Sequence, residues 1–209
     1  MGIQRVAPQN RNMITRLFNN KNKILKYHLD WTSNFVKNNI YNIEKNYSLY
    51  PSRNKWKCNV HTIHDYENEE RARDLDLVPD TSLHPIDYKF LRKEYEKLAV
   101  KVTKKLGIKE YELGDIWYNY YKQGQYQEPH IHDGNGGFTA VHYLIFNPQY
   151  HTPTLFDDPK IKSPRVKSGD IIFFSNSLWH YVPPNETDKP RLTVAFTLTD
   201  LNKVNEYDH

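Results

Sequence analysis

Apolar positions in the first half of the chain recur at helical spacing. Over residues 22–45 they fall three or four positions apart, which predicts an amphipathic helix. A clearer repeat of the same kind runs over residues 88–106, and Gly107 directly after it is typical of a helix C-cap. Between these helices, residues 57–63 alternate as a strand does, while residues 65–85 are charged and contain prolines, as expected of a loop. The N-terminal half is therefore predicted to be helical with one added strand.

The pattern changes after Gly107 to short runs of β-branched and aromatic residues, separated by Gly, Pro, Asn and Asp. These runs are residues 110–121, 138–146, 153–156, 170–175, 178–182 and 191–198. Short strands at this spacing, with turn residues between them, predict a β-sandwich or barrel. We therefore expect an α+β protein with a single domain over residues 1–209, divided into a helical part over 1–109, a β core over 110–199 and a tail over 200–209.

The composition narrows the class of protein. Of the 209 residues 38% are hydrophobic and 26% charged, and no apolar run approaches the roughly 20 residues of a membrane-spanning helix, so we expect no membrane partner. The first 30 residues lack the apolar core of a secretory signal, which favours a cytoplasmic location, or the host cytoplasm if the chain is viral. The single cysteine, Cys58, excludes internal disulfides and multi-cysteine metal sites. Any metal must therefore be held by histidine and carboxylate side chains.

The charge pattern bears on nucleic acid as a partner. The net charge of +4 is spread along the chain, with acidic residues between the Lys and Arg, and does not indicate strong nucleic-acid binding. The 16 tyrosines could nevertheless stack on bases, so an enzyme that oxidises a nucleobase stays open.

Two histidines stand one residue apart in "EPHIHDGNGG", residues 128–137. Positions i and i+2 of a strand point to the same side, so His130 and His132 can present both imidazoles to one cavity. His180, directly after the apolar run "DIIFFS", could supply a third ligand from a neighbouring strand. Neutral imidazoles bind iron, copper, zinc and nickel, and a facial triad leaves positions open for substrate and oxygen. Because the chain has ten histidines, such a pair also arises by chance, and spacing alone leaves a structural role open.

Arg191 adds an anion-binding group. It begins the strand "RLTVAFTL", where it places a permanently charged bidentate fork at a strand end. Thr193 points the same way, and Tyr143 in "AVHYLIF" offers a phenol from another strand. Three such donors beside a metal would suit a dicarboxylate that also chelates the metal, whereas a surface salt bridge is the alternative for Arg191 alone. Asn119 in "WYNYY" lies where a strand would line the site and could contact cofactor or substrate.

Taken together, these motifs resemble the Fe(II)/2-oxoglutarate-dependent dioxygenases, most closely the prolyl-hydroxylase-like branch with its bacterial and phage relatives. The resemblance covers about residues 110–199. "YKQGQYQEPHIHDGNGG" has the order of the family's segment around its first metal strand, "SGDIIFFSNSLWHYV" is similar to the strand pair that carries its second histidine, and "RLT" resembles its Arg-x-Ser/Thr pair. The resemblance implies a double-stranded β-helix core of the jelly-roll or cupin-like type, with the N-terminal helices packed on one sheet.

The resemblance also implies roles for individual residues. His130 and His180 correspond to the iron-ligating histidines, while Tyr143, Arg191 and Thr193 correspond to the residues that bind the far carboxylate of 2-oxoglutarate. Arg191 and the metal histidines would form the catalytic set.

The third ligand is where this chain departs from the family. The usual motif is His-x-Asp or His-x-Glu, whereas this chain has His130-Ile131-His132 followed by Asp133. We favour His132 as the third ligand, because Asp133 could face the site only through a bulge. Asp133 remains the alternative.

The expected function is an Fe(II)- and 2-oxoglutarate-dependent oxygenase that uses molecular oxygen to hydroxylate a substrate C–H bond, releasing succinate and CO₂. The resemblance favours a protein or peptide side chain as the substrate, and nucleic acid is not excluded. Two alternatives stay open: a non-catalytic jelly-roll module for binding or structure, and a three-histidine dioxygenase that is independent of 2-oxoglutarate.

Overall fold

The computed structural model describes residues 24–49, 61–64, 86–132 and 136–204. In chain order its elements are β1 (Leu25–His28), α2 (Thr32–Leu49), β2 (His61–His64), α4 (Tyr88–Leu106), β3 (Tyr111–Tyr121), β4 (Gln127–His130), β5 (Phe138–Ile145), β6 (Leu155–Phe156), β7 (Asp170–Ser175), β8 (His180–Val182), β9 (Arg191–Asp200) and α5 (Leu201–Val204). No helix in these ranges is both long enough and apolar enough to cross a membrane.

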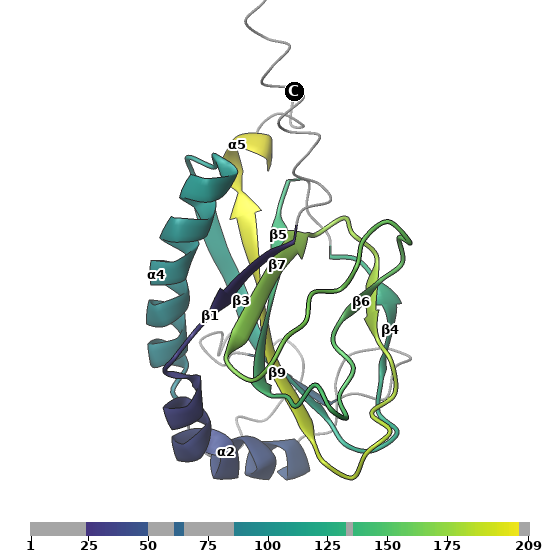
Figure 1. Cartoon of the computed structure of the whole chain (residues 1–209). Coiled ribbons are helices and arrows are strands. Elements are labelled where there is room, and N and C mark those ends of the chain that lie inside the picture. The colour runs from purple at the N-terminus through teal and green to yellow at the C-terminus, as the bar shows by residue number, and fades with distance from the viewer. Residues whose placement is uncertain (1–23, 50–60, 65–85, 133–135, 205–209) are drawn as a thin grey trace, which may run out of the picture.

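The strands form two antiparallel sheets. The larger has the order β1-β7-β5-β9-β3-β2 and the smaller the order β4-β8-β6. Helices α2 and α4 cover one side of the large sheet, and the small sheet lies on its other side (Figure 1). This arrangement agrees with the predicted α+β class and with helices packed on one sheet.

The alternation of side chains along the central strands builds a separate core on each face of the large sheet. On β9, Phe196 stacks on Tyr95 of α4, with ring centroids 4.5 Å apart, whereas Ala195 joins the cluster between the two sheets. On β7, Phe173 likewise belongs to the helix-side core and Phe174 to the inter-sheet core. The helix-side core holds the fold together, while the inter-sheet side is shared with a pocket.

Helix α4 confirms the helix predicted over residues 88–106. The Asp87 carboxylate accepts a hydrogen bond from the Phe90 N–H at 2.8 Å and so caps its first turn. Gly107 ends the helix in the left-handed conformation, with φ 76°, and its N–H donates to Thr103 O. A residue with a Cβ would be strained there, which explains the glycine.

The helix predicted over residues 22–45 is wrong in its first third. Leu25–His28 is strand β1, whose register partners are Phe173–Asp170 of β7, and the helix begins only at Thr32. Helical spacing over a few residues cannot outweigh a ladder of backbone hydrogen bonds at a sheet edge, and only the tertiary structure supplies the partner strand.

The six predicted strand runs are confirmed as β3, β5, β6, β7, β8 and β9, with ends that shift by a few residues. The strand predicted over residues 57–63 is confirmed for its last residues, which lie in β2. Residues 57–60 and the predicted loop over 65–85 lie outside the described ranges.

His142 of β5 is a buried polar residue in the helix-side core. Thr32 Oγ1 donates to Leu29 O at 2.7 Å, so it must accept from the Nε2–H of His142 at 2.8 Å. Nδ1 then accepts from the Tyr95 hydroxyl, also at 2.8 Å. Burial lowers the pKa of His142 to about 3, since the charged ring would lose its hydration. The imidazole is therefore held neutral.

This burial makes stability depend on pH. Below the ordinary histidine pKa of 6.5 the unfolded chain binds a proton at His142 that the folded chain refuses until about pH 3, so the free energy of unfolding should fall as pH falls between these values. From pH 6.5 to pH 5 the loss is about 2 kcal/mol. The free energy of unfolding of the metal-free protein is measured with urea at both pH values. His142→Gln should lose less of it between pH 6.5 and pH 5 than the parent does, by the amount that His142 contributes. Equal pH dependence in the two proteins would contradict the assignment.

Candidate metal and cofactor site

A pocket lies between the two sheets. Strands β3, β5 and β9 of the large sheet and β4 and β8 of the small sheet contribute to its walls. Its lining residues are Trp117, Asn119, Tyr121, Gln127, His130, His132, Thr139, Val141, Thr154, His180, Val182, Arg191, Thr193 and Ala195. The pocket thus gathers the three predicted metal histidines and three of the four predicted cofactor residues.

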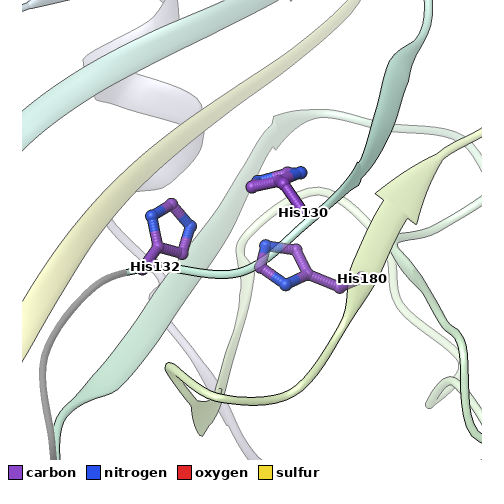
Figure 2. A group of neighbouring side chains, drawn as sticks. All are labelled: His130, His132 and His180. Carbon is purple, nitrogen blue, oxygen red and sulfur yellow. The ribbon is translucent and has the colours of Figure 1, made fainter.

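The three histidines converge within this pocket. His130 ends β4 and His180 begins β8, where the two are register partners. Their ring centroids lie 4.2 Å apart, and each lies 5.2 Å from the ring centroid of His132. One potential ligand atom from each residue lies within 4.8 Å of the other two, and the rings surround a shared space (Figure 2). This spacing fits a single metal ion held by three nitrogen ligands.

His132 reaches the site by a different route from the predicted one. It lies beyond the end of β4, so strand alternation with His130 does not place its ring. Its backbone N–H donates instead to Asn176 O, at 3.1 Å, in the turn between β7 and β8. Asp133, the alternative ligand, lies outside the described residues.

Hydrogen bonds to backbone carbonyls set the tautomers of two rings. His130 Nδ1 lies 2.8 Å from Glu128 O, and His180 Nδ1 lies 2.8 Å from Leu178 O. A carbonyl oxygen only accepts, so each Nδ1 carries the hydrogen and each Nε2 has the lone pair that a metal would use. Both rings therefore have the protonation pattern of metal ligands.

Burial keeps the triad neutral. Burial lowers the pKa of His130. Burial, together with repulsion from the His130 ring, lowers the pKa of His132 to about 4 and that of His180 to about 3. Neutral imidazole is the form that coordinates a metal, so at neutral pH no proton has to be displaced first.

Arg191 lies in the same pocket as a buried cation, with 3% of its surface exposed. Its Nη1 donates to Thr152 O at 2.9 Å, while Nε and Nη2 have no hydrogen-bond partner among the described residues. The guanidinium lies against the rings of Tyr121, Tyr143 and Phe146, at 5.0, 5.6 and 5.7 Å from their centroids. Burial lowers its pKa, but guanidinium stays charged at any ordinary pH. Two orphaned donors on a buried cation fit an anionic ligand, and a carboxylate matches their geometry.

The other predicted cofactor residues line up across the large sheet. Thr193 of β9 is the register partner of Asn119 on β3 and of Tyr143 on β5. Thr193 and Asn119 line the pocket, whereas Tyr143 is fully buried and not among the lining residues. The Tyr143 hydroxyl donates to Thr154 Oγ1 at 3.0 Å and accepts from the Thr154 N–H at 3.1 Å. Any effect of Tyr143 on a ligand in the pocket would therefore be indirect, through Thr154 or through Arg191, whose guanidinium lies against the Tyr143 ring.

Tyr121 is a pocket residue that sequence reasoning missed. Of the tyrosines in "WYNYY", Tyr118 and Tyr120 contact Tyr88 and Tyr47 on the helix side. Tyr121 faces the pocket, where its hydroxyl donates to Gln127 Oε1 at 3.0 Å. The available signal was alternation by two along the strand from Asn119, which puts Tyr121 and Trp117 on the same face.

Comparison with known proteins agrees with this geometry. Residues 142–197 match the family model described as "Putative 2OG-Fe(II) oxygenase". The matched segment includes Tyr143, His180, Arg191 and Thr193. No curated protein sequence matches the chain significantly.

Several solved structures share the fold. A prolyl hydroxylase from Trichoplax adhaerens, in complex with a hypoxia-inducible factor peptide, is 14% identical with a TM-score of 0.62, over 96% of this chain and 98% of that one. A Pseudomonas putida prolyl-4-hydroxylase is 12% identical with a TM-score of 0.58, over 90% and 97%. A collagen prolyl hydroxylase of Paramecium bursaria Chlorella virus-1, in complex with 2-oxoglutarate, is 20% identical with a TM-score of 0.52, over 84% and 94%. At these identities the likeness shows the shared fold alone.

The family match and the fold agree with each other and with the contents of the pocket. Residues 142–197 thus resemble a family of oxygenases that depend on Fe(II) and 2-oxoglutarate, and the chain shares its fold with prolyl hydroxylases.

Proposed function

We propose that this protein is an Fe(II)- and 2-oxoglutarate-dependent oxygenase that hydroxylates a substrate C–H bond, with His130, His132 and His180 as its Fe(II) ligands and Arg191 as the anchor of 2-oxoglutarate. The observation that carries the proposal is Arg191, a buried cation with two unpartnered donors among the described residues, in the same pocket as the histidine triad. Three imidazoles alone would suit several metals and several reactions. A buried guanidinium in the same pocket calls in addition for a carboxylate.

2-Oxoglutarate matches both kinds of binding group in the pocket. Its keto-acid end would chelate the metal, and its far carboxylate would accept from Arg191 Nε and Nη2. The Thr193 hydroxyl supplies a further donor from the same face of β9. Tyr143 assists through Thr154: because the Thr154 hydroxyl already accepts from Tyr143, its own hydrogen can point to the carboxylate. Asn119, the neighbour of Thr193 on β3, would contact the cofactor from the side.

The chain's own contribution is binding, orientation and exclusion of water. When bound, Fe(II) and 2-oxoglutarate supply the activation of molecular oxygen that breaks the C–H bond, with succinate and CO₂ as coproducts. The neutral triad leaves the charge of the metal uncompensated, which favours a dianionic cosubstrate. Burial of the ligands between two sheets keeps water from the reacting atoms.

The fold and substrate class are part of the proposal. We infer that the facing sheets form a double-stranded β-helix over residues 110–199, to which β1 and β2 add strands from the N-terminal part. The relatives whose names include prolyl hydroxylation, one of them with a bound peptide, support a protein or peptide side chain as the substrate. The cytoplasm remains the predicted location.

Anaerobic addition of Fe(II) and 2-oxoglutarate should give a weak visible metal-to-ligand charge-transfer band, because the keto-acid would chelate the metal directly. Succinate, which lacks the keto group, should give none and serves as the control. In air the complete mixture should form succinate from 2-oxoglutarate. A flat spectrum would count against the proposal, and oxygen consumption that needs no 2-oxoglutarate would favour the three-histidine alternative.

Arg191→Ala should weaken 2-oxoglutarate binding on the order of a hundredfold while iron stays bound, because a charge-assisted bidentate contact in a partly dry site contributes a few kcal/mol. Isothermal titration of the Fe(II)-loaded protein under nitrogen measures this. Arg165→Ala, a change at an exposed arginine, should leave the affinity unchanged. Parent-like affinity in Arg191→Ala would show that the cofactor assignment is wrong.

The third ligand can be tested with three variants. His132→Ala should abolish stoichiometric Fe(II) binding, and Asp133→Ala should leave it largely intact. His132→Asp would install a His-x-Asp facial triad and should keep the metal, since a carboxylate adds an anionic ligand. Iron content and succinate formation are measured for each. Metal retained in His132→Ala and lost in Asp133→Ala would make Asp133 the ligand.

A further inference from the structure

The position of His132 raises the question of what holds it in place. It lies beyond the end of β4, where the β4–β8 pairing with His180 stops at His130. Its backbone N–H donates to the carbonyl of Asn176, at 3.1 Å. That contact connects His132 to the turn between β7 and β8, so its placement depends on how firmly this turn is fixed.

Asn176 fixes the turn against the start of β5. Its side chain is buried, and its Oδ1 accepts from the Thr139 hydroxyl at 2.7 Å. Its backbone N–H donates to Gly137 O at 3.0 Å. A Cβ at Gly137 would clash with Asn176 Nδ2, so the glycine leaves the space that the amide fills. One amide side chain is thus fitted closely between two residues of the neighbouring segment.

The same turn also orients His180. Leu178 O accepts from His180 Nδ1 at 2.8 Å, and the Leu178 N–H donates to Ser175 O at 3.0 Å across the turn. His130 is held separately, through Glu128 O on its own strand. A displacement of the turn would therefore move two of the three rings relative to the third.

We propose that Asn176 is a positioning residue of the metal centre, which sets His132 and His180 at the spacing that one metal ion requires. The inference rests on the proposed function, because it takes the histidine triad as the ligand set. Hydrogen-bonding partners of metal ligands usually orient the ligand ring directly. Asn176 acts instead through the backbone of His132 and through the turn that carries Leu178, the hydrogen-bond partner of His180.

Two variants break the same hydrogen bond from opposite ends. Asn176→Ala removes the acceptor, and Thr139→Val removes the donor while leaving the asparagine in the turn. Each should weaken Co(II) binding by about 10- to 100-fold, the usual cost of losing such a partner. The absorption spectrum of the Co(II)-loaded full chain should also change, because it reports the ligand geometry. Thr139→Ser keeps the hydroxyl and should retain both affinity and spectrum.

Asn39→Ala is the matched control for lost stability. This buried asparagine also makes amide hydrogen bonds, donating to Phe35 O and accepting from the Asp87 N–H, but it lies on α2 in the helix layer. The control should unfold at lower urea concentration yet bind Co(II) like the parent. A purely structural role of Asn176 predicts instead that metal affinity follows stability in all variants.

The outcomes separate this inference from the proposed function. Parent-like Co(II) affinity and spectrum in Asn176→Ala and Thr139→Val would overturn it, as would equal weakening in Asn39→Ala. If Asn176→Ala does not fold, Thr139→Val decides the question alone. If His132→Ala binds Co(II) as the parent does, the ligand set itself is wrong, and the proposed function fails first.

Discussion

The burial of the Arg191 guanidinium between the two sheets is the constraint on which the site depends. A buried charge without a counter-ion costs several kcal/mol, and the described residues offset only part of this cost. The rings of Tyr121, Tyr143 and Phe146 face the cation, and Thr152 O accepts one of its hydrogens. Nε and Nη2 have no partner among the described residues, and under the proposed function they would donate to a carboxylate of 2-oxoglutarate, whose binding would then also stabilise the fold.

The histidines of the same pocket are buried without charge, in contrast to Arg191. His130, His132 and His180 are kept uncharged by their burial, and carbonyl partners turn two of them to present Nε2. The pocket thus holds both a permanent cation and neutral imidazoles. Under the proposed function this combination suits a cosubstrate with two carboxylates, because three neutral ligands would leave the charge of a bound metal uncompensated.

The large sheet separates stability from chemistry by strand alternation. His142 and Tyr143 are neighbours on β5, yet His142 bonds to Thr32 and Tyr95 in the helix-side core, while Tyr143 faces Arg191. The same division separates Tyr120 from Tyr121 on β3. Buried polar residues on the helix side thus serve the fold, while Asn119, Tyr121 and Thr193 on the other side line the pocket.

Elements with local signals could be predicted from the sequence. Helix α4 follows from its apolar repeat with Gly107 as cap, the strands after it from period-two runs, and Arg191 with Thr193 from alternation within one strand. The resemblance pointed to His130 and His180, the one-residue spacing pointed to His132, and the structure brings these three rings together.

Tertiary structure decided what depends on a partner far along the chain. Leu25–His28 is a strand because β7 lies beside it, and Tyr143 stands behind Thr154 because the segment before β6 crosses over it. Strand alternation with His130 predicted that His132 lies at the site. In the structure its backbone is held instead by the turn at Asn176, 44 residues further along the chain. Local periodicity records which face a side chain takes within one element. It carries no information on which other element supplies the hydrogen bond that fixes it.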